Sequence, residues 1–289
     1  MKRAGETSLP DSLVHVYRLL RQLVYELLRP FDFLARALNG KQALPPIHLR
    51  RHVGPLSSFE ASGAEFMTYL RLICELRADE KVLDLGCGCG QMALQLVDYL
   101  DRQAGSYRGL DLHQPSIAWC QRNISNRHPH FAFHDVDVCS RAYNRHGRLA
   151  AEDYTFPFGS EQFDLVIAKS VFTHMRPAEV DNYIKEIARV LAKGGRCLMT
   201  LFLLNEEQRK RARAGLNRLD FRFGDANWRY LHQSSPESAV AYDEQLALGW
   251  LKNHGLRLQR PIIYGQWSGN AEGLSFQDML LVEKDDNSV

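Results

Sequence analysis

The stretch KVLDLGCGCGQMAL, residues 81–94, constrains the fold more than any other part of the chain. A short apolar run is followed by three glycines at alternate positions and then by helical spacing, which predicts a strand, a tight turn and a helix. Glycine tolerates positive φ and lets a ligand approach the backbone, and a helix N-terminus offers unpaired N–H donors. A tight turn alone needs fewer glycines, so we predict that Gly86, Gly88 and Gly90 form a ligand-binding loop.

The charge beside this loop indicates which ligand it suits. A dinucleotide fingerprint has the spacing G-x-G-x-x-G, whereas this loop reads G-x-G-x-G and follows an acid, Asp84. A carboxylate so close to a pyrophosphate would repel it, but the same carboxylate favours a cationic ligand. S-adenosylmethionine carries a sulfonium and an ammonium group and no phosphate, so we expect it rather than a dinucleotide.

Short apolar segments alternate with helical segments from residue 81 to residue 203. Strands that alternate with helices predict a parallel sheet with crossover helices. We expect strands at 81–85, 107–111, 131–136, 163–168 and 196–203, and helices at 59–77, 90–103, 114–126 and 177–192. A helix near 241–254 and two closing strands within 256–265 and 274–284 are expected to complete the domain.

The motif VLDLGCGCG resembles the first motif of class I S-adenosylmethionine-dependent methyltransferases, because a strand precedes it, a helix follows and an acid ends the next strand. The resemblance extends from about Phe59 to Lys284. It implies an α/β fold with a seven-stranded, mostly parallel sheet flanked by helices. Residues 275–283 would form the last, antiparallel strand.

The resemblance also implies a division of the chain. We expect an N-terminal helical cap or lid over residues 1–58 and a methyltransferase domain over 59–289. Insertions at 139–160 and 205–240 are expected to shape the acceptor side, because the shared fold supplies only the cofactor chemistry.

The N-terminal region contains an expected amphipathic helix, residues 12–38, which Pro30 would kink or divide. Arg18 and Arg21 interrupt its apolar part and no small-residue cleavage site follows, so we do not interpret it as a signal peptide. Over residues 1–55, nine basic residues stand against four acidic ones. We expect the helix to pack as a lid or as a homodimer contact, and shallow membrane attachment is the alternative.

The resemblance assigns further cofactor contacts. Asp111, at the end of the second strand, would accept hydrogen bonds from both ribose hydroxyls, and capping of the next helix is an alternative role. An acid after the third strand would meet the adenine amino group; we favour Asp137, since Val138 then presents its N–H to the ring, and Asp135 is the alternative. The expected cofactor-binding residues are Asp84, Gly86, Cys87, Gly88, Gly90, Gln91, Asp111, Leu112, Asp137, Val138, Lys169 and Ser170.

The exit of the fourth strand, FDLVIAKSVFTHM, lines the methionine end of the cofactor and the acceptor in the enzymes that this chain resembles. Residues 168–170 lack the acidic cluster with which catechol-type enzymes hold magnesium, so we expect no metal. Motifs of the enzymes that methylate DNA bases are absent, and the net charge is only +2, which argues against nucleic acid. Gln91 stands where many members of a bacterial subgroup of these methyltransferases have arginine. Cys87 and Cys89 lack the second pair of ligands that a thiolate metal site needs, so we interpret them as small fillers of the loop.

His174 is the imidazole closest in sequence to this exit, and we predict that it is the general base. An alcohol acceptor loses a proton as the methyl group arrives, and histidine is the commonest base for that step. A packing or capping role is the alternative for His174. Glu179, Asp225, Tyr230 and His232 are further candidates for the base.

Arginines and aromatic residues gather in the two expected insertions. Together they suit a phosphate or carboxylate beside an apolar or sugar ring, and a solvated helix face is the alternative. The expected substrate contacts are Phe172, Arg222, Trp228, Arg229 and Tyr230. SVFTHM, AYNRHG and FPF also resemble a bacterial subgroup associated with glycan, glycolipid and natural-product assembly, which implies a hydroxyl acceptor.

The sequence therefore predicts a metal-independent S-adenosylmethionine-dependent methyltransferase that acts on a small-molecule hydroxyl. Transfer to nitrogen or carbon is the first alternative, and a non-catalytic cofactor-binding assembly protein is the second. We interpret the six scattered cysteines as reduced thiols of a cytoplasmic protein. No apolar run approaches the roughly 20 residues that span a bilayer.

Overall fold

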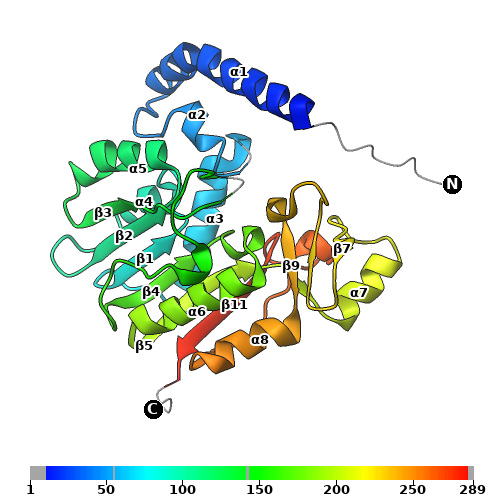
Figure 1. The fold of residues 1–289 in the computed structure, drawn as a ribbon. Helices are drawn as coiled ribbons and strands as arrows, with labels where there is room; N and C mark the ends of the chain where they lie inside the picture. The colour runs from blue at the N-terminus through cyan, green and yellow to red at the C-terminus, as the bar shows by residue number, and fades with distance from the viewer. Residues whose placement is uncertain (1–10, 55, 141–142, 286–289) are drawn as a thin grey trace. The chain divides into compact units, whose positions relative to one another are not determined.

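A computed structural model describes residues 11–54, 56–140 and 143–285 (Figure 1). The chain forms two compact units, Met1–Ala61 and Ser62–Val289. The first unit contains α1 (Asp11–Leu38) and α2 (Ile47–Arg50), and α3 (Phe59–Leu72) begins within it. The predicted N-terminal helix is present, and it runs through Pro30 without being divided.

The second unit is built on a seven-stranded sheet with the strand order β10-β11-β5-β4-β1-β2-β3. Its parallel strands are β1 (Lys81–Leu85), β2 (Ser106–Asp111), β3 (Phe131–Asp135), β4 (Phe163–Ala168) and β5 (Leu191–Leu201). β11 (Asp278–Lys284) runs antiparallel between β5 and β10 (Leu256–Leu258). The predicted fold class is confirmed, including the antiparallel strand near the C-terminus.

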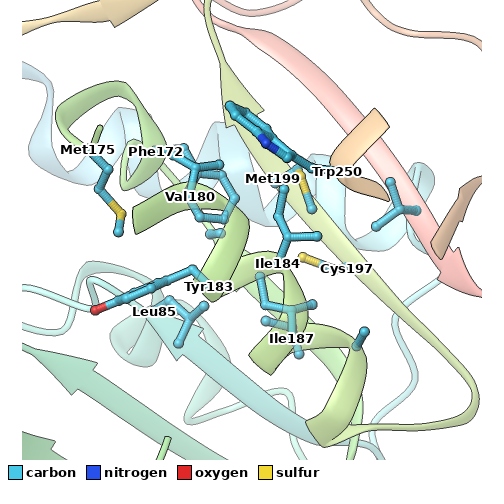
Figure 2. Packing of buried hydrophobic residues seen from close by; sticks show 14 of the residues in the cluster. Leu85, Phe172, Met175, Val180, Tyr183, Ile184, Ile187, Cys197, Met199 and Trp250 are labelled. Atoms are coloured by element: carbon cyan, nitrogen blue, oxygen red, sulfur yellow. The ribbon is translucent and has the colours of Figure 1, made fainter. Parts of the chain in front are cut away.

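Both faces of the central strands are buried, as expected for a parallel sheet between helices. Alternate residues of β1, β4 and β5 pack with α6 (Pro177–Val190) and α8 (Glu244–Asn253) in one hydrophobic cluster. Figure 2 shows this packing, with Ile184 and Ile187 of α6 near Cys197 of β5. The same cluster contains Phe172, just beyond the end of β4.

Several predicted helices have different bounds, and α3 already ends at Leu72 rather than at residue 77. The helix expected at 90–103 is α4 (Gln91–Leu96), after which the chain continues in turns. The N–H of Asp101 donates to Ala78 O at 2.8 Å, which directs the chain back toward β1. The helix expected at 114–126 is α5 (Gln114–Cys120), which continues as one π-helical turn to Ser125.

The helix expected near 241–254 begins later than predicted. Val240–Asp243 form strand β9, and α8 starts at Glu244. The Asp243 carboxylate accepts the N–H groups of Gln245 and Leu246 and so caps the helix, which fixes this boundary.

Residues 203–243 contain a second sheet that the sequence did not predict. Its strand order is β6-β9-β8-β7, with β6 (Leu203–Leu204), β7 (Phe223–Gly224) and β8 (Trp228–Tyr230), and α7 (Glu206–Arg213) lies between β6 and β7. The buried Asp278 carboxylate joins the two sheets: it accepts the N–H of Leu203 at 2.7 Å and Nε1–H of Trp267 at 2.8 Å.

Candidate functional site

The glycine loop after β1 has the backbone conformation that glycine permits. Gly86, Gly88 and Gly90 have φ of 69°, 54° and 80°. A Cβ at position 86 would lie 2.7 Å from Val171 Cγ2, and one at position 90 would lie 2.9 Å from Ile124 Cδ1. Larger residues would therefore strain the backbone and displace neighbouring side chains.

The loop is held against the end of β2 by Asp111. One carboxylate oxygen accepts the N–H of Gly88 at 2.7 Å, and the other accepts the N–H of His113 at 2.7 Å. Burial raises the pKa of Asp111, and these hydrogen bonds oppose that rise. An ionised carboxylate has about four acceptor sites, so this group can accept further hydrogen bonds from a ligand.

Asp84 lies beneath the loop rather than on its surface. It is buried in β1 and accepts a hydrogen bond from the hydroxyl of Tyr107 at 2.5 Å. Burial raises the pKa of Asp84 to about 7, while the Tyr107 hydrogen bond and the charge of Lys169 act in the opposite direction. Cys87 and Cys89 are buried as well, in keeping with a filling role.

Lys169 and Gln91 are brought together at the exit of β4. The Lys169 ammonium donates to Gln91 Oε1 at 2.9 Å and to Ser62 Oγ at 3.2 Å, and it lies 4.9 Å from the centre of the Phe66 ring. Burial lowers the pKa of Lys169 to about 8, opposed by the charges of Asp84 and Glu65. A cation thus lies beside Gln91, at the place where the resemblance led us to expect an arginine.

The backbone turns sharply directly after Lys169. Ser170 has φ of 57°, a conformation that is uncommon for a residue with a side chain. Its N–H donates to Thr200 Oγ1 at 2.7 Å, and its hydroxyl donates to Gln277 Oε1 at 3.0 Å. These contacts fix the start of the segment that carries His174.

The candidate adenine residues lie after β3. Arg148 donates a hydrogen bond to the side chain of Asp137, and this bond, together with the charge of Arg148, lowers the pKa of that carboxyl. Val138 is buried, and Leu112 is half-buried against the main core. Asp135 is exposed. Of the two acids, Asp137 therefore already has a partner within the segment 139–160.

His174 ends a short 3₁₀ turn, η4 (Phe172–His174), that follows β4. Its Nδ1 lies 2.9 Å from the carbonyl oxygen of Glu237. Because a carbonyl only accepts, Nδ1 carries the proton and the lone pair of the neutral ring is on Nε2. Burial lowers the pKa of His174, so the ring is neutral at pH 7. The hydroxyl of Tyr242 holds the same turn from β9 through the carbonyl of Phe172, at 2.6 Å.

Two residues beside His174 were not predicted from the sequence. The ring of Tyr143 packs edge-on against His174 with 5.6 Å between ring centres. Glu237 is buried, and Ser140 Oγ donates to its carboxylate at 3.5 Å. The segments 139–160 and 205–240 therefore meet at His174. The AYNRHG motif that contains Tyr143 was the available signal.

The three aromatic residues among the predicted acceptor contacts lie in or against the main core, apart from the two arginines. Phe172 is fully buried in the main core, where Figure 2 shows it near Val180. Trp228 and Tyr230 have ring centres 5.4 Å apart and pack against that core. Because side chains alternate along a strand, Arg229 points to the opposite face of β8.

The arginines also have partners of their own. Arg222 is 69% exposed and pairs with Asp220 at 2.6 Å, and Arg229 Nε donates to the carbonyl of Asp225. Both arginines therefore have partners within the segment 205–240, and the arginine rim for an anionic acceptor stays a prediction.

The other candidate bases have structural roles or lie in solvent. Glu179 accepts the N–H of Arg176 at 2.6 Å and caps α6, and the Asp225 carboxylate accepts N–H groups of Asn227 and Trp228 within a turn. His232 is exposed.

Among the described residues, no three His, Cys, Asp or Glu side chains are grouped so that they could hold a metal ion. Over the same residues, no helix is both long and apolar enough to cross a membrane.

Residues 83–199 match the family model of the methyltransferase domain. An uncharacterized methyltransferase from Synechocystis sp. is 28% identical over 144 residues, which are 50% of this chain and 57% of that protein. A phthiotriol/phenolphthiotriol dimycocerosates methyltransferase from Mycobacterium ulcerans is 29% identical over 157 residues, 54% of this chain and 49% of that protein. The chain thus spans about half the length of these curated relatives.

A solved structure supports the fold over a longer stretch. A protein from Pyrococcus horikoshii aligns with a TM-score of 0.52 at 17% identity, covering 78% of this chain and 91% of that chain. At this identity the likeness shows the fold alone.

Proposed function

We propose that this chain, which belongs to the class I S-adenosylmethionine-dependent methyltransferases, transfers a methyl group to a hydroxyl of a small molecule. The observation that carries the choice of a hydroxyl is the orientation of His174. Its Nδ1–H is donated to the Glu237 carbonyl, so Nε2 is the nitrogen of the neutral ring that would take a proton. A hydroxyl needs such a base, whereas a neutral amine attacks with its own lone pair.

Three charged residues around the glycine loop have the charges that S-adenosylmethionine requires. Asp111 would accept the ribose hydroxyls with the acceptor sites that Gly88 and His113 leave unused. The Lys169 ammonium, whose hydrogen-bond partners Gln91 and Ser62 are neutral, would bind the carboxylate of the methionine end. The buried Asp84 would add a negative field beneath the sulfonium and ammonium groups.

S-adenosylmethionine, when bound, supplies an electrophilic methyl carbon on a positively charged sulfur. His174 Nε2 would take the proton of the hydroxyl as the new O–C bond forms and the C–S bond breaks, which leaves S-adenosylhomocysteine. Tyr143 would limit the positions of the acceptor, since its ring packs on His174. Most of the acceleration would come from alignment of acceptor oxygen, methyl carbon and sulfur.

Two further observations support this proposal. The Mycobacterium ulcerans relative is named for phthiotriol and phenolphthiotriol dimycocerosates, and an alcohol acceptor is in keeping with that name. Residues 168–170 lack the acidic cluster with which catechol-type enzymes hold magnesium, so we propose a metal-independent reaction. Turnover is therefore expected to survive an excess of chelator.

The proposal is tested by a screen of alcohols, amines and activated carbon acids for S-adenosylhomocysteine formation, followed by variants on the best acceptor. His174→Ala is expected to lower turnover by about 10²–10⁴-fold and to leave S-adenosylhomocysteine affinity unchanged, because the base acts only in the chemical step. His232→Ala is the matched control, since that imidazole is exposed. Equal turnover in both variants, or activity on amines alone, would refute the hydroxyl assignment.

A further inference from the structure

The first unit is held together by the polar side of α1. The Asp32 carboxylate accepts hydrogen bonds from Arg36 Nε at 2.9 Å, from the N–H of Ile47 at 3.1 Å and from Arg50. Arg36 also donates to the carbonyl of Leu44 at 2.8 Å. The side chain of Asp32 is only 6% exposed, so this polar cluster is an interior contact. The charged side of the helix is thus the side that packs.

The opposite side of α1 is apolar and open. At about 100° per residue, seven large side chains fall on an arc of about 140° that faces away from Asp32 and Arg36. They run over 16 residues, a length of about 24 Å. This set, called the apolar face of α1, consists of Leu23, Val24, Leu27, Leu28, Phe31, Leu34 and Leu38, with exposed fractions between 40% and 78%.

A contiguous exposed face of this kind marks a contact with something else. The second unit contains no comparable set among its described residues. Its exposed large hydrophobic side chains come from four separate stretches of chain: Leu72, then Tyr143 and Leu149, then Leu216, then Leu274 and Phe276. Single exposed side chains of this kind are ordinary in proteins.

Charge decides which partner suits the apolar face best. Residues 1–55 carry nine basic and four acidic groups, a net +5, while the whole chain carries +2. The remaining residues, 56–289, therefore carry −3, from 2 minus 5. A second copy would bring two like-charged segments together. A surface with anionic headgroups over hydrocarbon complements both the charge and the apolar face.

We propose that α1 lies in the surface of an anionic lipid membrane, with its apolar face among the acyl chains. Helices of this kind combine a strongly apolar face, a charged opposite face and low overall hydrophobicity. The basic groups and α2 would remain in the headgroup and water layer. The proposal does not depend on the methyl-transfer reaction, so a failure of one leaves the other standing.

The test is co-sedimentation of the full chain with vesicles of equal parts phosphatidylcholine and phosphatidylglycerol, and with vesicles of phosphatidylcholine alone. We expect binding to the anionic vesicles, which weakens several-fold in the neutral ones and at high salt. Phe31→Ser should reduce the partition coefficient about tenfold, because it removes a large side chain from the apolar face.

Phe33→Ser is a closely matched control. Phe33 is 66% exposed and Phe31 is 71% exposed, but Phe33 lies about 160° around the helix, outside the apolar face. Retention of vesicle binding in Phe33→Ser together with its loss in Phe31→Ser would support the proposal. Absence of binding to anionic vesicles, or equal losses in the two variants, would overturn it.

Two measurements without vesicles test whether the apolar face contacts a second copy of the chain or the methyltransferase unit instead of a membrane. A dimeric mass by light scattering that becomes monomeric in Phe31→Ser would assign the face to a second copy and overturn the proposal. Weaker S-adenosylhomocysteine binding by Phe31→Ser would mean that the apolar face contacts the methyltransferase unit as a lid. That result would also overturn the proposal.

Discussion

The cofactor end and the acceptor end of the proposed site are built from different parts of the chain. At the cofactor end, consecutive elements supply the centre of the site: β1, the glycine loop and the end of β2, joined by the hydrogen bond from Gly88 to Asp111. At the acceptor end, His174 is placed by Glu237 and Tyr143, which are 63 and 31 positions away in the chain (237 − 174 and 174 − 143). The first end depends on local backbone geometry, and the second depends on two distant segments that meet.

This difference predicts that substitutions at the cofactor end act on binding, and the largest effect is expected for Asp111→Ala. The change removes the acceptor of the Gly88 and His113 N–H groups as well as the proposed ribose contacts. Hydrogen bonds to charged groups contribute about 1.5–3 kcal/mol each, so S-adenosylhomocysteine affinity should fall at least about a hundredfold.

Calorimetric titration measures this effect, and Asp98→Ala, at an exposed position after α4, is the control. An Asp111→Ala variant that binds as tightly as the control would show that this carboxylate has no part in cofactor binding.

Lys169→Met is expected to have a smaller and more selective effect. If the ammonium binds the cofactor carboxylate, affinity for S-adenosylhomocysteine should fall about tenfold, because the variant loses one partly buried contact between charged groups. Affinity for methylthioadenosine, which lacks the amino-acid group, should not change. Lys185→Met, on the exposed side of α6, serves as the control.

The comparison of the two ligands separates this role from general destabilisation. Equal losses for S-adenosylhomocysteine and methylthioadenosine would mean that Lys169 supports the loop through Gln91 and Ser62 without contacting the carboxylate.

The smallest expected effect concerns stability. Burial raises the pKa of Asp84 from its ordinary value of 3.8 to about 7. Between these values the folded protein binds more protons than the unfolded chain, so its stability falls as pH rises through this window. Asp84→Asn keeps an oxygen that can accept from Tyr107 and removes the titration. Its melting temperature should therefore decline less than that of the parent, by a few degrees, as pH rises from about 5 to about 8.

Thermal unfolding without cofactor, at several pH values, measures this slope. If the parent and Asp84→Asn lose stability in parallel, Asp84 does not carry the pH dependence.

The comparison of the two ends also explains what could be predicted from the sequence. β1 and β4 were located to the residue because both faces are buried, so each strand reads as a short, mostly apolar run. The loop was found because positive φ requires glycine, and three such positions leave a visible pattern.

The parts that were missed depend on contacts distant in sequence. β7 and β8 are two and three residues long, too short for an alternating pattern to be read. The arginines of 205–240 were assigned to the acceptor from composition, which does not show that Asp220 and the Asp225 carbonyl engage Arg222 and Arg229. Tyr143 and Glu237 lie far from His174 in the chain, and only the fold brings them to it.

The central claim is that a neutral His174 takes the proton of the acceptor, and the pH dependence of turnover tests it most directly. Burial lowers the pKa of His174 below its ordinary value of 6.5, so the base is deprotonated at neutral pH and becomes protonated as the medium is acidified. With saturating cofactor and acceptor, turnover should be level near pH 7 and above and fall tenfold per unit once the pH is below that pKa. The residual turnover of His174→Ala should lack this acid limb. An acid limb that persists unchanged in His174→Ala would contradict the account.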